Sequence, residues 1–137
     1  MVVKAQGGIS LEVGDKIVTT KKTGKYIGEI TQVFPDHYVF KVLAVLKHPA
    51  QGDLHHPNEG DVPFFHERKA LAFGEQANIP RKTVKPYNGE IPDYEASLKT
   101  AVRELMEKLE KEDTLYSRKS IAALKSLMKE YGISPVG

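Results

Sequence analysis

The chain has 137 residues, a formal net charge of +2, 40% hydrophobic and 28% charged residues, and no cysteine. This length and composition are typical of one globular domain with its own hydrophobic core, which excludes a largely disordered chain. Without cysteine the protein cannot form disulfides, use a thiol nucleophile or carry a lipid on a cysteine. The nearly balanced charge disfavours a strongly basic nucleic-acid-binding protein.

The sequence shows no signal for export or membrane insertion. Its first residues, MVVKAQGGISLEVGDKI, contain no apolar stretch of signal-peptide length and no small-residue cleavage site. The longest apolar run, Val42–Leu46, is far shorter than the ~20 residues that cross a bilayer. We therefore expect a cytoplasmic protein that reaches the membrane only through a partner.

The part of the chain before Pro92 predicts short strands joined by tight turns, because glycine, proline and β-branched residues gather there. Gly28 within one of these strands predicts a sharp bend or a close backbone approach. No crossover helix separates the strands, so we expect an antiparallel sheet, and five short strands with one long loop fit a small SH3-like barrel. The predicted strands are residues 16–21, 25–34, 37–46, 68–73 and 75–80, with a short closing segment at 83–87.

The strand predicted at 37–46 is apolar on both faces from Val42 to Leu46. A strand buried on both sides needs a covering layer. The helices after Pro92 are the first candidate for this layer, and a second copy of the chain is the next.

After Pro92 the sequence becomes rich in Ala, Leu, Lys and Glu and predicts two amphipathic helices. Asp93 is expected to cap the first, and the second runs from about Tyr116 to Tyr131 and ends at Gly132. Such a hairpin is stable only when its apolar stripes pack on something. The stripes are Tyr94, Leu98, Ala101, Val102, Leu105, Met106 and Leu109, then Ile121, Leu124, Leu127, Met128 and Tyr131.

These patterns predict an α+β, mainly β, fold. Residues 1–92 form the SH3-like antiparallel barrel, with a long ordered loop at 47–67. Residues 93–137 form the C-terminal helical hairpin, packed either on the barrel or on a second chain.

The loop HPAQGDLHHPNEGDVPFFH, residues 48–66, holds four of the five histidines. Each of its prolines fixes one backbone φ angle, and its two glycines are expected at positive φ. A long loop with so many conformational restraints is predicted to be ordered and to bind a protein. The prolines are Pro49, Pro57 and Pro63, the glycines are Gly52 and Gly60, and the apolar residues expected to tuck under the barrel are Val62, Phe64 and Phe65.

The loop also contains enough histidine and acidic side chains to suggest a metal site. However, His55 and His56 are adjacent and point opposite ways in an extended chain, and no helical His pair or cysteine completes a zinc motif. The sequence has no nucleophile-elbow motif and no glycine-rich phosphate loop before a helix. We predict no enzyme and no cofactor, with a metal or small-ligand site as the third hypothesis. Its ligands would come from His48, His55, His56, His66, Asp53, Glu59 and Asp61.

Five stretches of the chain together resemble the kinase-associated protein B family of spore-forming bacteria. The resemblance implies an SH3-like barrel followed by helices and no catalytic residues. It also implies support of a membrane sensor histidine kinase, kinase B, that feeds the sporulation phosphorelay. Members of the family are described as lipoproteins, whereas this chain lacks the cysteine for such an anchor. The stretches are GDKIVTTKKTGKYIGEI (14–30), FKVLAVLKHPAQGDLHHP (40–57), DVPFFHERKALAF (61–73), EQANIP (75–80) and VKPYNGEIPDY (84–94).

The leading hypothesis is therefore a binding module, in a two-component system, that supports a sensor histidine kinase of the kinase B type. The oligomeric state is left open between a monomer and a homodimer. The predicted contact or loop-shaping residues are His48, Gln51, Asp53, Leu54, His55, Phe64, Phe65, His66 and Arg68. The alternative is nucleic-acid binding by the barrel through a basic patch of Lys21, Lys22, Lys25, Arg81, Lys82 and Lys85.

Overall fold

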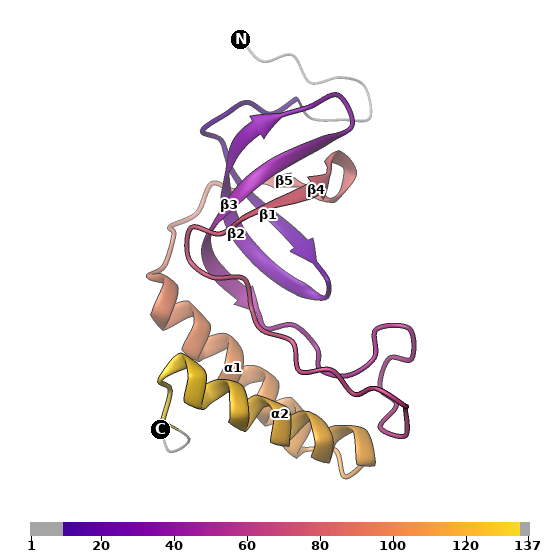
Figure 1. Cartoon of the computed structure of the whole chain (residues 1–137). Helices are drawn as coiled ribbons and strands as arrows, with labels where there is room; N and C mark the ends of the chain where they lie inside the picture. The colour runs from indigo at the N-terminus through magenta and orange to yellow at the C-terminus, as the bar shows by residue number, and fades with distance from the viewer. Residues whose placement is uncertain (1–9, 135–137) are drawn as a thin grey trace.

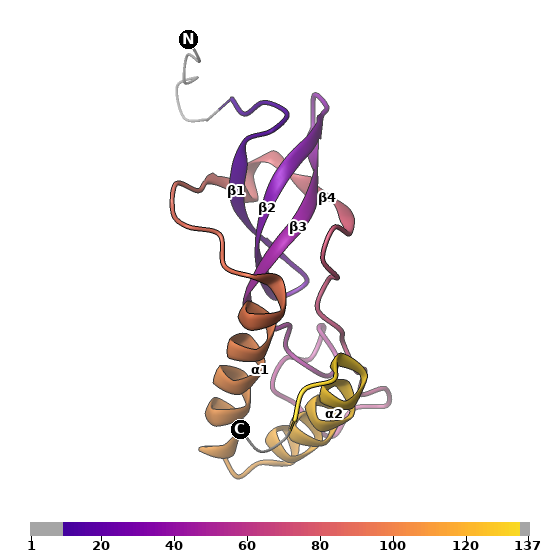
Figure 2. The same cartoon turned by 90° about the vertical axis from the view of Figure 1, so that its left-hand side faces the viewer.

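A computed structural model describes residues 10–134 of the chain. It contains one five-stranded antiparallel sheet, with strand order β4-β3-β2-β1-β5, and two helices beyond one end of that sheet (Figures 1 and 2). This confirms a mixed α+β, mainly β, fold, and the SH3-like detail stays a prediction. The elements are β1 (Lys16–Lys21), β2 (Gly24–Val33), β3 (His37–Lys47), β4 (Gln76–Pro80), the short 3-10 helix η1 (Arg81–Thr83), β5 (Lys85–Pro86), α1 (Tyr94–Glu110) and α2 (Leu115–Tyr131).

The sheet is strongly curled around its apolar face. The register between β2 and β3 shifts at three places, one of them at Gly28. A Cβ atom on Gly28 would collide with the Phe40 ring and the Lys41 carbonyl oxygen, so glycine permits the close approach that the sequence predicts. The curl brings β1 back towards β4, where Lys21 Nζ donates a hydrogen bond to the Asn78 carbonyl oxygen at 2.8 Å.

Helix α1 covers the strand that is apolar on both faces. The amide of Val45 donates to Ser97 Oγ at 3.0 Å, and Leu98 and Val102 belong to the same buried cluster as Val45. The covering layer therefore comes from the chain's own helix. The division at Pro92 stays a prediction, because the hydrophobic core runs across it.

Both helices begin and end where local signals place them. Asp93 caps α1 by accepting a hydrogen bond from the Ala96 amide, and Thr114 forms a capping box with Ser117 at the start of α2. Gly132 adopts a left-handed φ of 74° and ends α2. The distal parts of the two helices form a second buried cluster, which contains Leu109, Tyr116, Leu124 and Leu127.

The predicted strand at residues 68–73 is wrong, because this segment is extended but pairs with no strand. Side chains that are distant along the chain bind the amides of this segment in place of a neighbouring backbone. The bonds run from Arg68 N to Gln51 Oε1 (2.9 Å), from Ala70 N to Tyr131 Oη (3.0 Å) and from Leu71 N to Tyr26 Oη (3.2 Å).

Gln51 joins the two ends of the long loop. Its side chain is buried, and it donates to the carbonyl oxygens of Pro49 and Arg68, each at 3.0 Å, while its Oε1 accepts from the Arg68 amide. The carboxamide thus binds both backbone polar groups of Arg68, as a paired strand would. The Tyr116 hydroxyl donates to the Gln51 carbonyl oxygen at 3.1 Å, which ties this junction to α2.

His48 links the end of β3 to the end of α2. Its Nδ1 lies 3.0 Å from the Pro49 carbonyl oxygen, which can only accept, so Nδ1 carries the proton. Nε2 therefore accepts from the Tyr131 hydroxyl at 2.9 Å, and that hydroxyl accepts in turn from Ala70 N. Burial lowers the pKa of His48, and the hydrogen bond to Pro49 opposes this shift only in part, so the neutral ring is favoured.

Gln51→Ala is expected to lower the free energy of unfolding by about 2–4 kcal/mol, because the amide and the carbonyl of Arg68 lose their partners in a half-buried place. Chemical denaturation measures this change. The matched control is Gln32→Ala, which removes an exposed glutamine from β2 and should change the value by less than about 0.5 kcal/mol. Equal effects of the two substitutions on the free energy of unfolding would contradict the role of Gln51 in joining the two ends of the loop.

The stability of the protein is expected to fall as the pH drops below about 6.5, the ordinary pKa of histidine. The folded state holds the pKa of His48 below that value, so the unfolded chain takes up a proton first. The contribution of the neutral His48 ring to stability is complete above the pKa that this ring has in the unfolded chain. It is lost as the pH falls through the lower pKa of the folded state.

Urea unfolding at several pH values between about 7.5 and 5 measures the slope of stability against pH. His48→Gln, which has no titrating ring, should flatten this slope. His55→Gln replaces an exposed histidine and should keep the wild-type slope. An unchanged slope in His48→Gln would show that the buried ring does not control the acid response.

Candidate functional site

The long loop projects beside α2 at the end of the molecule away from the sheet (Figure 1). Its tip is built from turns. The Asp53 carboxylate accepts a hydrogen bond from the His55 amide at 2.9 Å, and the Asp53 carbonyl oxygen accepts from the His56 amide at 3.0 Å. Asn58 has a positive φ of 64°, which asparagine tolerates well. The tip therefore has a defined backbone, although it contains no helix or strand.

The first turns of α2 hold the tip in place. Lys119 Nζ donates to the Gly60 carbonyl oxygen at 2.7 Å, and the Phe65 ring packs on the Tyr116 ring with centroids 6.0 Å apart. Gly52 has a φ of +100°, as predicted, whereas Gly60 is absent from the positive-φ glycines of the described chain. A glycine is needed at position 60 for another reason, since a Cβ atom there would collide with the backbone of Leu115 and Tyr116.

The apolar residues of the loop do not tuck under the barrel, so that prediction is wrong. Phe65 is half-buried and packs against Tyr116 of α2 and the buried cluster between the two helices, away from the apolar face of the sheet. Val62 is half-buried. Phe64 is 71% exposed and stacks on the His66 ring, with centroids 6.2 Å apart. The loop thus presents an aromatic pair to solvent.

The nine predicted site residues fall into three groups. His48 and Gln51 are buried and shape the loop from within. Asp53, Leu54, Phe65 and Arg68 are half-buried, and Arg68 Nε donates to the Gly52 carbonyl oxygen at 3.3 Å. His55, Phe64 and His66 are exposed.

Sequence reasoning missed the residues of α2 that hold the loop, namely Tyr116 and Lys119. A buried tyrosine hydroxyl needs a hydrogen-bond partner. The tyrosine at the start of α2 was therefore the one available signal for a contact outside the helices. We name as the loop surface the exposed residues His55, Phe64 and His66, together with Leu115, which is 44% exposed at the start of α2.

The ionisable groups of the site serve as structural hydrogen-bond partners. Burial raises the pKa of Tyr94 and Tyr131 to about 12, so both phenols stay protonated and can donate. The Tyr94 hydroxyl donates to the Leu71 carbonyl oxygen at 2.5 Å, and the Tyr131 hydroxyl donates to His48. These groups hold the extended segment after the loop and the end of β3 in place.

The histidines of the loop lie apart from one another. His48 is buried against Tyr131, while His56 lies at the tip, with its Nδ1 3.6 Å from Glu59 Oε2. Within residues 10–134, no three histidine or acidic side chains converge as metal ligands would. The structure gives the metal hypothesis no ligand set in this range.

The predicted basic patch includes two cations that stabilise the sheet. Lys21 binds the Asn78 carbonyl oxygen, and the Arg81 guanidinium donates twice to the Phe34 carbonyl oxygen, at 3.0 and 2.6 Å. Arg81 also lies over the Tyr38 ring, 4.8 Å from its centroid. The remaining members, Lys22, Lys25, Lys82 and Lys85, are exposed. Nucleic-acid binding through this patch stays a prediction.

Neither helix in the described part of the chain combines the length and the apolar character required to cross a bilayer.

Comparisons with known proteins agree on one family. The family model for kinase-associated protein B matches residues 21–132. Kinase-associated lipoprotein B of Bacillus subtilis (strain 168) is 55% identical over 122 residues, which are 89% of this chain and 95% of that protein. The X-ray crystal structure of kinase-associated protein B from Bacillus cereus is 44% identical, with a TM-score of 0.78, and the match covers 90% of this chain and 100% of that one. By sequence and by fold, this chain belongs to the kinase-associated protein B family.

Proposed function

We propose that the protein is a non-enzymatic accessory factor that binds a membrane sensor histidine kinase of the sporulation phosphorelay and supports its activity. The names of the family and of the Bacillus subtilis relative, which both refer to kinase association, support this role. The protein acts in the cytoplasm and reaches the membrane through the kinase. The loop surface is the contact site.

The observation that carries this proposal is an exposed aromatic side chain on a loop with a fixed shape. Phe64 is 71% exposed, yet the loop on either side of it is held by Gln51 and by α2. A surface that is already ordered binds without the entropic cost of ordering a flexible segment. Large side chains on such surfaces often contribute most of the binding energy at an interface.

Support of a kinase by binding alone requires no chemistry in the accessory protein. A factor that binds the active conformation of the kinase better than the inactive one shifts the population towards it. The magnitude of this shift is limited by the difference between the two affinities. The loop surface needs only to recognise a shape that the active kinase presents.

Phe64→Ser is expected to weaken binding to the cytoplasmic part of the kinase by about tenfold or more, the effect of losing one central aromatic contact. Binding to the immobilised kinase fragment by biolayer interferometry measures the change. The matched control is Phe73→Ser, since Phe73 is 64% exposed and also makes one ring contact, with Tyr94 at 5.9 Å.

The control should bind as the wild type does, and both variants should unfold at the wild-type denaturant concentration. Equal binding by Phe64→Ser and the wild type would remove the loop surface from the proposed contact. No binding of the wild-type protein to the kinase fragment would contradict the proposed function itself.

A further inference from the structure

A cavity of about 440 Å³ lies between the long loop and the connected ends of the two helices. Its walls come from the turn between β1 and β2, the end of β3, the base and the tip of the loop, α1 and the start of α2. Clefts that hold small molecules measure about 300–1,000 Å³ and combine apolar walls with a few polar groups. The size of the cavity therefore suits a ligand of metabolite size.

The buried part of the cavity wall is apolar. Leu105 and Leu109 of α1 line it together with Tyr116 of α2. His48 lines it as well, but both of its ring nitrogens are already hydrogen-bonded, and burial lowers its pKa. The neutral ring therefore offers carbon atoms and no charge to a ligand, and an apolar group fits against this wall.

The exposed residues around the mouth of the cavity carry a net positive charge. Lys47 and Lys108 line the mouth, with Glu112 as the acid among its lining residues. Within the range that the structure describes, neither lysine has a salt bridge or a hydrogen bond. Lys47 also faces Lys25 in the register of β2 and β3, and like charges in facing positions repel each other. An anion at the mouth would relieve this repulsion.

Strained backbone gathers at the same mouth. Of the three described residues other than glycine that have a positive φ, two line the cavity, namely Thr23 (72°) and Asn58 (64°). Such a φ is a genuine outlier for a β-branched residue such as threonine. The Ala50 amide donates to Thr23 Oγ1 at 2.9 Å, which ties the strained turn to the base of the loop. Strain of this kind clusters at sites that hold a ligand.

We propose that this cavity binds a small organic anion, a carboxylate or a phosphate monoester on an apolar body. The anionic group lies at Lys47 and Lys108, and the apolar body lies against Leu105 and the buried wall. Because the loop tip and α1 both line the cavity, a bound ligand contacts both and stabilises the docked position of the loop. The ligand is a small molecule, so this site goes beyond the proposed kinase contact and does not depend on it.

NMR titration of the full-length chain tests the site with benzoate, phenyl phosphate and the neutral benzyl alcohol. At constant ionic strength, at least one of the two anions should shift the Ala50 amide and the methyls of Leu105 and Leu109 saturably. Its dissociation constant should be on the order of a few millimolar, as expected for a probe of this size. Benzyl alcohol should bind at least about tenfold more weakly, because it lacks the charge. The anion that binds more tightly identifies the preferred anionic group.

Lys47→Met combined with Lys108→Met should weaken binding of that anion by about tenfold or more, because methionine keeps the apolar stem and removes the charge. Glu112→Gln should strengthen it, since this change removes the acid at the mouth. The matched control is Lys99→Met, which changes an exposed lysine of α1 outside the cavity and should bind as the wild type does. Chemical denaturation checks that every variant is folded.

Hydrogen exchange measures the effect of the ligand on the loop. The amides of His55 and His56 in the tip, which both donate to Asp53, should exchange more slowly when the site is saturated with the anion. Unchanged exchange at both amides would contradict the stabilisation of the loop.

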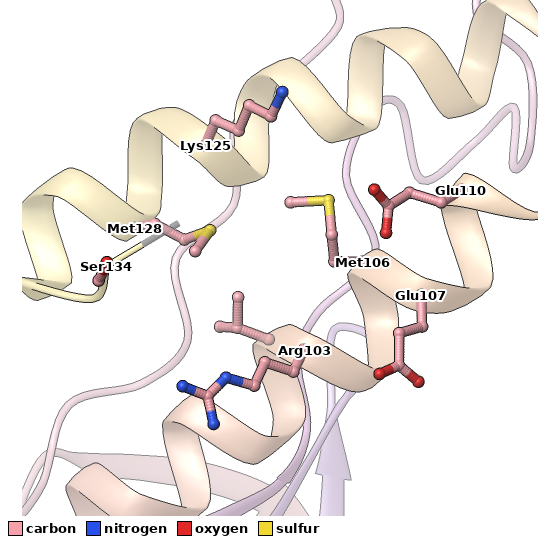
Figure 3. A pocket seen from close by; sticks show the side chains of 8 residues that line it. Arg103, Met106, Glu107, Glu110, Lys125, Met128 and Ser134 are labelled. Atoms are coloured by element: carbon pink, nitrogen blue, oxygen red, sulfur yellow. The ribbon is translucent and has the colours of Figure 1, made fainter. Parts of the chain in front are cut away.

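The proposal is overturned if neither anion gives a saturable shift at these positions up to about 50 mM, well above the expected dissociation constant. It is overturned equally if benzyl alcohol binds as tightly as the anions, or if the doubly substituted variant binds as the wild type does. Shifts confined to the methyls of Met106 and Met128 would also contradict it. They would place the probes in the groove between α1 and α2 (Figure 3), which shares no lining residue with the cavity. None of these results involves the kinase, so the proposed function is tested separately.

Discussion

The pairing of the Gln51 carboxamide with the backbone of Arg68 is the interaction on which the shape of the loop depends. Residues 48–75 connect two neighbouring strands and contain no strand or helix. Backbone groups buried in such a segment must still find hydrogen-bond partners. Side chains supply many of them here, from Gln51 within the loop and from tyrosines of β2, α1 and α2. The loop, the sheet and the helices therefore depend on one another.

This dependence gives each helix a second role. Helix α1 covers β3 and also supplies Tyr94 to the extended segment after the loop. Helix α2 holds the loop tip through Tyr116 and Lys119 and holds the loop base through Tyr131. Its opposite side forms one wall of a groove between the two helices, into which Met106 and Met128 point (Figure 3). The same helix thus contacts the loop on one side and faces α1 on the other.

Local signals in the sequence predicted most of the regular elements. The strand at 16–21 and the helix caps at Asp93 and Gly132 depend on residues close in sequence, and the structure confirms them. The resemblance to the family, read from five stretches of sequence, is confirmed by the comparisons. The prediction of a strand at 68–73 failed because the hydrogen-bond partners of this segment are side chains far away along the chain, which no local pattern reveals.

The candidate site was predictable as a segment but not residue by residue. Phe64 and Phe65 are adjacent, so in an extended chain one must face away from whatever the other contacts. Which of the two is exposed depends on the position of α2, and the sequence does not give that position. The same reason explains Gly60, whose close contact with α2 was read as a need for positive φ.

Hydrogen exchange of individual amides tests most directly whether the connection between β3 and β4, residues 48–75, is ordered without any strand pairing. In the folded protein, the amides of Gly52, Arg68, Ala70 and Leu71 belong to no paired strand, yet each donates to a defined oxygen. They should exchange with protection close to that of the amides in β3, because opening them requires the helices to separate from the sheet. Exchange of these four amides at the rate of an unstructured peptide, with β3 still protected, would contradict a pre-shaped loop.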